Sequence, residues 1–228
     1  MAPSLATKIP GPGSVLHAWL QLLLEGIVFE GLWGSGRSFL AAWMIASVLG
    51  ITLGLLMAAS RTFRDMLTPI IELLRPIPSA AIIPLAIVFL GLNDPMKICV
   101  ATYAATWPVL VTAASALSRI DEQMVHICRQ FGLRGRLRYL LRVQIPSSSP
   151  ELLTSMRTSS IIALALTITT ELVSSGNGLG NWIVRFDQAA RVPEMYDCII
   201  TVMLLGSVLY TIAIAAETLL TPWVTRTT

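Results

Sequence analysis

The chain has 228 residues, of which 54% are hydrophobic and 13% are charged, and its formal net charge is +3. An average soluble domain carries about 25% charged residues. This composition therefore excludes an ordinary soluble domain and predicts an all-α membrane protein. Three cysteines and two histidines are scattered along the chain without zinc-binding spacing. We expect no metal site, no disulfide framework and no nucleic-acid partner.

The N-terminal region precedes the membrane-length segments. Residues 1–14 include a Pro- and Gly-rich stretch, which predicts a disordered lead-in, and they lack the basic start and apolar core of a cleavable signal. Residues 15–35 are largely apolar, but Glu25, Glu30 and several glycines favour an interfacial elbow helix on the outer surface. A sixth membrane-spanning helix is the open alternative for this stretch.

A glycine pattern at residues 31–38 nearly matches a phosphate-binding loop. Such a loop needs a lysine after its last glycine, and Arg37 stands there instead. It also needs a buried strand upstream, whereas this stretch leads into an uncharged run of 22 residues from Ser38 to Ala59. We therefore expect the glycines to form the turn into the first membrane span.

Five segments are long and apolar enough to cross a bilayer core of about 30 Å. They are residues 38–59, 69–92, 97–118, 152–173 and 197–220. Pro76, Pro78 and Pro84 interrupt the second segment, so neighbouring helices or a cavity must satisfy the backbone groups that these prolines free. Arg157 and Glu171 bracket a Thr- and Ser-rich core in the fourth segment. We expect that segment to face protein or an aqueous path.

Residues 121–150 form an Arg-rich insert between the third and fourth segments. Its apolar residues have the i, i+3, i+4 and i+7 spacing of one helix face, at Met124, Ile127, Cys128 and Phe131. Because an exposed apolar stripe usually has a partner, we expect the insert to dock on another protein. The alternative is a helix on the inner leaflet with its arginines on anionic lipid.

The placement of basic residues predicts the orientation in the membrane. Arginines are concentrated in the insert, in the connection at residues 61–64 and at the C-terminal tail. The alternate connections hold only Lys97 in one, and Arg185 with Arg191 in the other. The positive-inside rule then places the insert and the C-terminus in the cytoplasm.

The insert resembles the cytoplasmic loop of bacterial ABC-importer permeases of the binding-protein-dependent, type I class. That loop reads Glu-Ala-Ala, three residues, Gly, nine residues, Ile-x-Leu-Pro, and Gly132 and Pro146 take its glycine and proline positions. His126-Ile127-Cys128 stands where Glu-Ala-Ala would be. Thirteen residues separate Gly132 from Pro146 instead of the usual twelve. The helix-turn-helix pattern is retained, but a contact by the loop's Glu does not carry over.

Other segments are similar to the nitrate/sulfonate/taurine branch of these permeases. The similarity is carried by the proline-containing residues 73–78 and 83–86, and by Thr-Glu-Leu at 170–172 with the Gly-rich run at 175–183. Together with an elbow-like N-terminal stretch, it extends in order over residues 12–225.

This resemblance implies a permease domain over residues 36–225, with five or six transmembrane helices, an outer elbow helix and a coupling helix in the insert. It implies the permease subunit of an ATP-driven importer in the bacterial inner membrane, which forms the pathway for a small anionic solute. Two copies would pair, each docked on a subunit of an ATPase dimer that holds ATP and Mg²⁺. A solute-binding protein would deliver the solute outside, and no cofactor is expected on this chain itself.

The resemblance and the residue types together assign candidate roles. ATPase coupling is expected at Met124, His126, Ile127, Cys128, Phe131, Gly132, Leu133 and Pro146. The solute pathway is expected at Arg75, Thr167, Thr170, Glu171 and Ser174, and contact with the binding protein at Asn177 and Trp182. Structural alternatives stay open: Glu171 as the ion-pair partner of Arg157 or Arg75, Arg75 as a helix anchor, the hydroxyl residues as links between helices, and a plain Gly-rich turn before Trp182.

Two other function classes are weighed against this one. A secondary transporter driven by an ion gradient would need inverted repeats and paired broken helices, and the sequence offers one Pro-broken segment without a repeat. A membrane-embedded enzyme would need converging titratable groups, and the spans offer only Arg75, Arg157 and Glu171.

Overall fold

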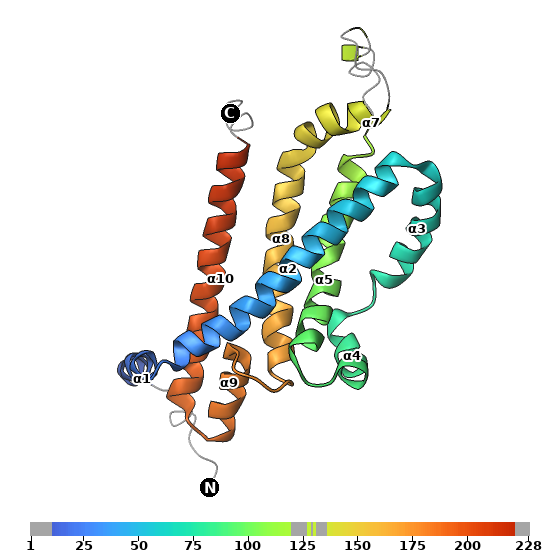
Figure 1. Cartoon of the computed structure of the whole chain (residues 1–228). Coiled ribbons are helices and arrows are strands. Elements are labelled where there is room, and N and C mark those ends of the chain that lie inside the picture. The colour runs from blue at the N-terminus through green and yellow to red at the C-terminus, as the bar shows by residue number, and fades with distance from the viewer. Residues whose placement is uncertain (1–10, 120–126, 129, 131–135, 222–228) are drawn as a thin grey trace. The chain divides into compact units, whose positions relative to one another are not determined.

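The computed structural model describes residues 11–119, 127, 128, 130 and 136–221, and these residues form helices without a strand (Figure 1). The helices are α1 (Pro12–Leu24), α2 (Ile27–Ala59), α3 (Arg61–Leu74), α4 (Ile83–Leu90), α5 (Asp94–Ala116), α7 (Arg136–Tyr139), α8 (Ile145–Glu171), α9 (Leu179–Gln188) and α10 (Val192–Leu220). Two short elements, η2 (Ser79–Ile82) and η3 (Leu140–Gln144), precede α4 and α8. The predicted all-α membrane class is confirmed.

Four stretches are long and apolar enough to cross a membrane, namely Ile27–Ala59, Asp94–Ala116, Arg142–Glu171 and Val192–Leu220. Arg61–Leu74 and Ser79–Leu90 form a pair bent by 86°, which is either a broken span or a re-entrant loop. Counted as one span, this pair gives the predicted number of five, although it begins at Arg61 and not at residue 69. The break falls at Pro76 and Pro78, as predicted.

The N-terminal helices differ from the predicted bounds. α1 has 13 residues, about 20 Å of helix, which is too short for a bilayer core of about 30 Å. The chain turns at Gly26, whose φ of +79° favours glycine, and α2 begins at Ile27. The predicted elbow at 15–35 therefore ends at Leu24, and residues 27–35 belong to the first spanning helix. The glycines at 31–36 lie inside α2 and form no turn.

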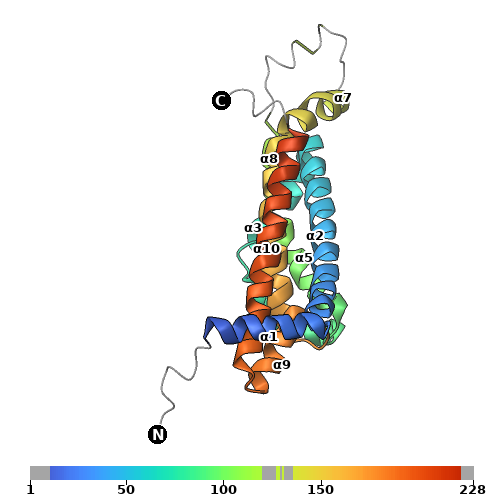
Figure 2. The same cartoon turned by 90° about the vertical axis from the view of Figure 1, so that its left-hand side faces the viewer.

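α1 has one face against the protein and one face exposed. Ala18 and Leu22 are buried, whereas Leu16 and Leu20 are exposed. Figure 2 shows α1 lying across the start of α10, where Trp19 Nε1 donates to the hydroxyl of Thr201 at 3.4 Å. This geometry fits an interfacial helix better than a sixth span.

The chain divides into two compact units. Unit 1 comprises Met1–Ala42, Ser79–Ala101 and Ala163–Leu209, and unit 2 comprises Trp43–Pro78, Thr102–Ile162 and Tyr210–Thr228. Unit 1 has two apolar clusters, one around Leu22, Val28, Phe186 and Cys198 and the other around Ile83, Ala86, Met96 and Val100. Unit 2 is centred on Ala58, Ala113, Leu117 and Leu152.

Small residues allow α2 and α5 to approach closely in unit 2. A Cβ added at Gly50 would lie 2.7 Å from Val109 Cβ, and one at Gly54 would lie 2.4 Å from Ala113 Cβ. Gly50 and Gly54 have the spacing of the small-xxx-small motif, which joins helices in lipid by close van der Waals contact. This pair of glycines is a packing signal that the sequence predictions above do not include.

Polar side chains also join the helices of unit 2. Ser159 Oγ on α8 donates to the carbonyl of Ala105 on α5 at 2.7 Å, and Trp43 Nε1 on α2 donates to the carbonyl of Met156 at 3.0 Å. Because lipid offers these groups no partner, such bonds link neighbouring helices. The Ser- and Thr-rich composition of the fourth span thus has a packing role here.

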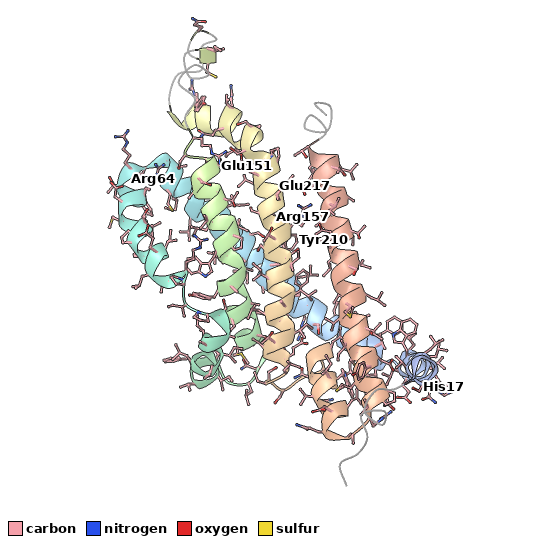
Figure 3. All side chains as sticks on the ribbon, turned by 180° about the vertical axis from the view of Figure 1, so that it is seen from behind. His17, Arg64, Glu151, Arg157, Tyr210 and Glu217 are labelled. Carbon is pink, nitrogen blue, oxygen red and sulfur yellow. The ribbon has the colours of Figure 1, made fainter. Side chains whose placement is uncertain are left out.

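Arg157 on α8 pairs with Glu217 on α10, and not with Glu171 (Figure 3). Arg157 Nη1 lies 3.0 Å from Glu217 Oε2, and the hydroxyl of Thr154 donates to Glu217 Oε1 at 2.6 Å. The guanidinium also lies over the ring of Tyr210, 5.6 Å from its centroid. The two charged side chains are 26% and 21% exposed, so water screens the pair only partly.

Replacement of Gly54 by Ala should separate α2 from α5. We expect a loss of about 1–3 kcal/mol in the free energy of unfolding, the usual cost of overpacking, measured by thermal unfolding in detergent. Gly36→Ala on the same helix is the control, because nothing lies within 4 Å of a Cβ at that position. Equal melting temperatures for the two variants would contradict the close approach.

Replacement of Arg157 by Gln should leave the Glu217 carboxylate without its cation. We expect about 1–2 kcal/mol of destabilisation, between the values for exposed and fully buried pairs. The matched control is Arg119→Gln, which removes a more exposed pair, 69% and 46% exposed, with Glu151. A double-mutant cycle with Glu217→Gln measures the coupling, and additive effects would refute the pairing.

Candidate functional site

Two cavities of unit 2 share the side chain of Arg75. Each has a volume of about 370 Å³. The first is lined by Met57, Arg64, Thr68, Ile71, Glu72, Arg75, Leu110, Val111, Ala114, Ser115 and Ser118. The second is lined by Arg75, Ala104, Trp107, Pro108, Val111, Thr112 and Ile162. The two cavities lie along one side of α5, with Arg75 and Val111 common to both.

The break in the second span places Arg75 between these cavities. α3 ends at Leu74, and Pro78 has no N–H to donate to the carbonyl of Leu74 four residues earlier. The hydroxyl of Tyr103 on α5 donates to that carbonyl at 2.6 Å, and the N–H of Ile77 donates at 3.1 Å. The freed backbone group is thus satisfied, as a membrane interior requires. Arg75 follows a complete helix of 14 residues, α3, and lies beside α5.

The two arginines that line the cavities differ in their partners. Arg64, near the start of α3 (Figure 3), donates to the carbonyl of Met57 at 3.3 Å and to the hydroxyl of Ser118 at 2.6 Å. The Arg75 guanidinium makes no side-chain hydrogen bond or ion pair within the described residues. Glu72 lines the first cavity without an ion pair to Arg75. Arg75 therefore keeps its five donors for a ligand.

The second cavity combines this cation with an aromatic and apolar wall. Trp107 packs edge-on against Tyr103, with ring centroids 5.2 Å apart. Besides Arg75, the polar groups of the lining are the Thr112 hydroxyl and the indole N–H of Trp107, and the other side chains are apolar. A small anion in this open cavity would meet the guanidinium of an exposed arginine beside a partly apolar wall.

The predicted pathway residues on α8 belong to unit 1 and are not among the side chains that line these two cavities. Thr167 and Thr170 are fully buried, and their hydroxyls donate to backbone carbonyls of α8. Neither residue lines a cavity that the described chain shows. Their geometry favours a role in helix packing, and their assignment to the pathway stays a prediction.

Glu171 ends α8 and is held by α2 and α9. Its carboxylate is fully buried and accepts from Ser35 Oγ at 2.8 Å and from the N–H of Gly180 at 2.9 Å. Ser35 Oγ in turn accepts from the N–H of Leu179 at 2.9 Å. We call these four residues, Ser35, Glu171, Leu179 and Gly180, the Glu171 cluster. The structural alternative of an ion pair between Glu171 and Arg157 or Arg75 is not what the described residues show, because hydrogen bonds from α2 and from the N-terminus of α9 hold this carboxylate. The assignment of Glu171 to the solute pathway stays a prediction.

A third cavity, also about 370 Å³, lies beside this cluster in unit 1. It is lined by Glu30, Trp33, Gly34, Arg37, Asp94, Lys97, Gly176, Asn177 and Gly178. Asp94 binds Arg37 and, at 2.7 Å, the Nζ of Lys97, whose side chain is only 2% exposed. The cations of this cavity are thus paired, unlike Arg75.

The two residues predicted to contact a binding protein, Asn177 and Trp182, differ in their exposure. Asn177 is exposed and lines the third cavity. Trp182 is partly buried in an apolar cluster, stacked on Phe186 with ring centroids 5.6 Å apart. Arg185 covers its ring, 4.7 Å from the centroid. Asn177 is accessible to a partner, and Trp182 serves mainly in packing. Ser174, a predicted pathway residue, lies in the same loop as Asn177, and its backbone carbonyl accepts a hydrogen bond from Asn181 Nδ2.

Only part of the predicted coupling surface is described. Ile127 is 47% exposed and Cys128 is 7% exposed, so the two members of the apolar stripe differ in accessibility. Pro146 is exposed in the first turn of α8. Met124, His126, Phe131, Gly132 and Leu133 lie outside the described residues. The coupling role of all eight stays a prediction.

The chain is similar in sequence to known membrane transport proteins. Residues 50–226 match the model of a family described as "Binding-protein-dependent transport system inner membrane component". A Methanocaldococcus jannaschii protein named as an ABC transporter permease is 31% identical over 86% of this chain and 73% of its own length. The taurine transport system permease protein TauC of Escherichia coli is 26% identical over 94% of this chain and 80% of its own.

Solved structures give the same architecture. The inward-facing methionine ABC transporter MetNI has a chain that superposes with a TM-score of 0.71 at 16% identity, over 85% of this chain and 96% of that one. At this identity the match supports the fold alone.

Replacement of Tyr103 by Phe removes the donor that satisfies the Leu74 carbonyl. We expect a loss of about 1 kcal/mol in the free energy of unfolding, from one hydrogen bond beside a proline break. Tyr210→Phe is the control, because its ring keeps the contact with Arg157. The comparison is made by thermal unfolding in detergent, and a melting temperature equal to that of the control would show that the bond contributes nothing.

Proposed function

Because the chain belongs to the family of binding-protein-dependent transport system inner membrane components, we propose that it forms the solute pathway of an ATP-driven importer for a small anion. It is the permease subunit of such an importer. In this proposal, two copies pair in the inner membrane, and the solute passes along the cavities that Arg75 borders. The alternative of a secondary transporter loses its support, because the family is defined by transport with a binding protein.

One observation carries the choice of an anion: Arg75 is a cation that lines two cavities and makes no ion pair within the described chain. A guanidinium at a break in a membrane span is costly unless an anion or water meets it. Its planar donors fit the oxygens of a carboxylate or sulfonate in two parallel hydrogen bonds. The relative TauC is named for taurine, which carries a sulfonate group, and this supports the same ligand chemistry.

The partners proposed for this chain follow from the family and the sequence. A separate ATPase dimer holds ATP and Mg²⁺ and docks on the insert at residues 121–150, where Ile127 presents a 47% exposed side chain. The insert and the C-terminus face the cytoplasm by the positive-inside rule. A solute-binding protein delivers the anion on the other side, where the exposed Asn177 offers a contact. Membrane lipid covers the exposed apolar side chains of α10.

Replacement of Arg75 by Gln tests the anion pathway. With purified permease, its ATPase and its binding protein in liposomes, we expect the KM for uptake of a labelled solute with a sulfonate group, such as taurine, to rise at least tenfold, or about 1.4 kcal/mol. Arg75→Lys should keep part of the affinity, because it keeps the charge but loses the paired donors. Arg61→Gln is the control, because Arg61 is an exposed arginine at the first residue of α3 and lines neither cavity.

The result that would contradict the pathway is a KM in Arg75→Gln equal to that of Arg61→Gln. Uptake that proceeds without ATP or binding protein, driven by an ion gradient, would overturn the proposed importer itself.

A further inference from the structure

Glu171 and Ser35 do not line the Arg75 cavities, yet both are fully buried polar side chains of unit 1 that bond to each other. Both side chains have 0% exposure, and the donor and acceptor atoms come from three helices, α2, α8 and α9. A carboxylate buried in this way is costly unless it is held by hydrogen bonds. What the cluster holds in place is the loop of residues 172–178 between α8 and α9.

The Glu171 cluster fixes both ends of that loop. Ser35 Oγ donates to Glu171 Oε2, at the start of the loop, and accepts from the N–H of Leu179 at its end. One hydroxyl thus bridges both ends to α2. Asn181 Nδ2 adds bonds to the carbonyls of Glu171 at 2.6 Å and Ser174 at 2.7 Å.

Glycines bring the loop and α2 into direct contact. A Cβ at Gly34 on α2 would lie 2.9 Å from the carbonyl oxygen of Asn177, and one at Gly31 would lie 2.7 Å from Leu179 Cδ2. A Cβ at Gly178 would lie 2.2 Å from the Glu171 carboxyl carbon. Gly31, Gly34 and Ser35 have the i, i+3, i+4 spacing of one helix face. That face of α2 is therefore the seat of the α8–α9 loop.

The same loop forms part of the third cavity. Gly176, Asn177 and Gly178 line it from the loop, and Trp33 and Arg37 line it from α2. Asn177 and Trp33 are exposed, the latter at 74%. A partner that binds at this cavity therefore touches α2 and the loop together.

We propose that Ser35 and Glu171 are positioning residues that hold the α8–α9 loop on α2, so that the loop and α2 present one preformed surface to the solute-binding protein. This inference rests on the proposed function for the identity of the partner. Preformed surfaces bind more tightly because less conformational freedom is lost on binding. Loss of the cluster should thus weaken binding of the partner and leave the transport step itself intact.

The chain offers a matched pair of serines for the test. Ser35 and Ser38 are both buried on α2, but Ser38 Oγ has no hydrogen-bond partner in the described structure. Ser35→Ala therefore removes the bridge, and Ser38→Ala removes a hydroxyl of the same kind without a bond. Glu171→Gln keeps an oxygen for Gly180 and Ser35, whereas Glu171→Ala removes both bonds.

The first measurement reports the loop directly. Asn177→Cys is introduced into the full chain with its three native cysteines replaced by Ala, and its labelling by a membrane-impermeant maleimide is timed in the assembled transporter. We expect Ser35→Ala and Glu171→Ala to raise the labelling rate at least fivefold, and Ser38→Ala and Glu171→Gln to leave it within twofold. Equal rates in all four variants would overturn the positioning role.

The second measurement separates positioning from general damage. In liposomes with the ATPase, we expect Ser35→Ala to raise the concentration of binding protein that gives half-maximal uptake about fivefold, with an unchanged maximal rate. A lower maximal rate at an unchanged half-saturating concentration would overturn the inference. If the wild-type transporter takes up solute without any binding protein, the proposed function fails, while the labelling rates still decide whether Ser35 and Glu171 hold the loop.

Discussion

A backbone carbonyl inside a bilayer must find a hydrogen-bond donor within the protein, because lipid offers none. This constraint governs the break between α3 and η2, where Pro78 leaves the carbonyl of Leu74 without its usual partner. Tyr103 on α5 supplies the donor from a neighbouring helix. The same contact holds the broken span against α5, and so places Arg75 between two cavities. The position of Arg75 thus depends on the hydrogen bond from the Tyr103 hydroxyl to the Leu74 carbonyl at the helix break.

Close packing of helices follows a second physical rule. Lipid tails are as apolar as leucine, so burial of apolar surface gives helices little reason to associate. The chain uses glycines instead, at Gly50 and Gly54 towards α5 and at Gly31 and Gly34 towards the α8–α9 loop. Buried hydrogen bonds, such as those from Ser159 to the Ala105 carbonyl and from Ser35 to Glu171, fix how the helices are oriented at these contacts. Small residues let the backbones approach, and hydroxyls such as those of Ser159 and Ser35 form hydrogen bonds across the contacts.

The spans and the break were predictable from the sequence, because an uncharged run and a proline each determine the structure of the residues next to them. The candidate cation Arg75 was also predictable, since an arginine beside two prolines in an apolar segment is a strong local signal. The partners of Glu171 and Arg157 were not, because Ser35 lies 136 positions from Glu171 and Glu217 lies 60 positions after Arg157. Trp107 on α5 and Ser118, two residues after its end, carried no sequence signal that pointed to a cavity. The glycines at 31–36 were misassigned to a turn because their contacts with Leu179 and Asn177 are long-range.

The sharing of Arg75 by two cavities has a consequence for stoichiometry. In the proposed pathway the Arg75 guanidinium can pair with one monovalent anion at a time, so an anion bound in one cavity withdraws this cation from the other. Arg64 also lines the first cavity, but its guanidinium is already bonded to Met57 and Ser118. Under this proposal the two cavities would be successive binding sites for the same ion, and one Arg75 would not hold two anions at once.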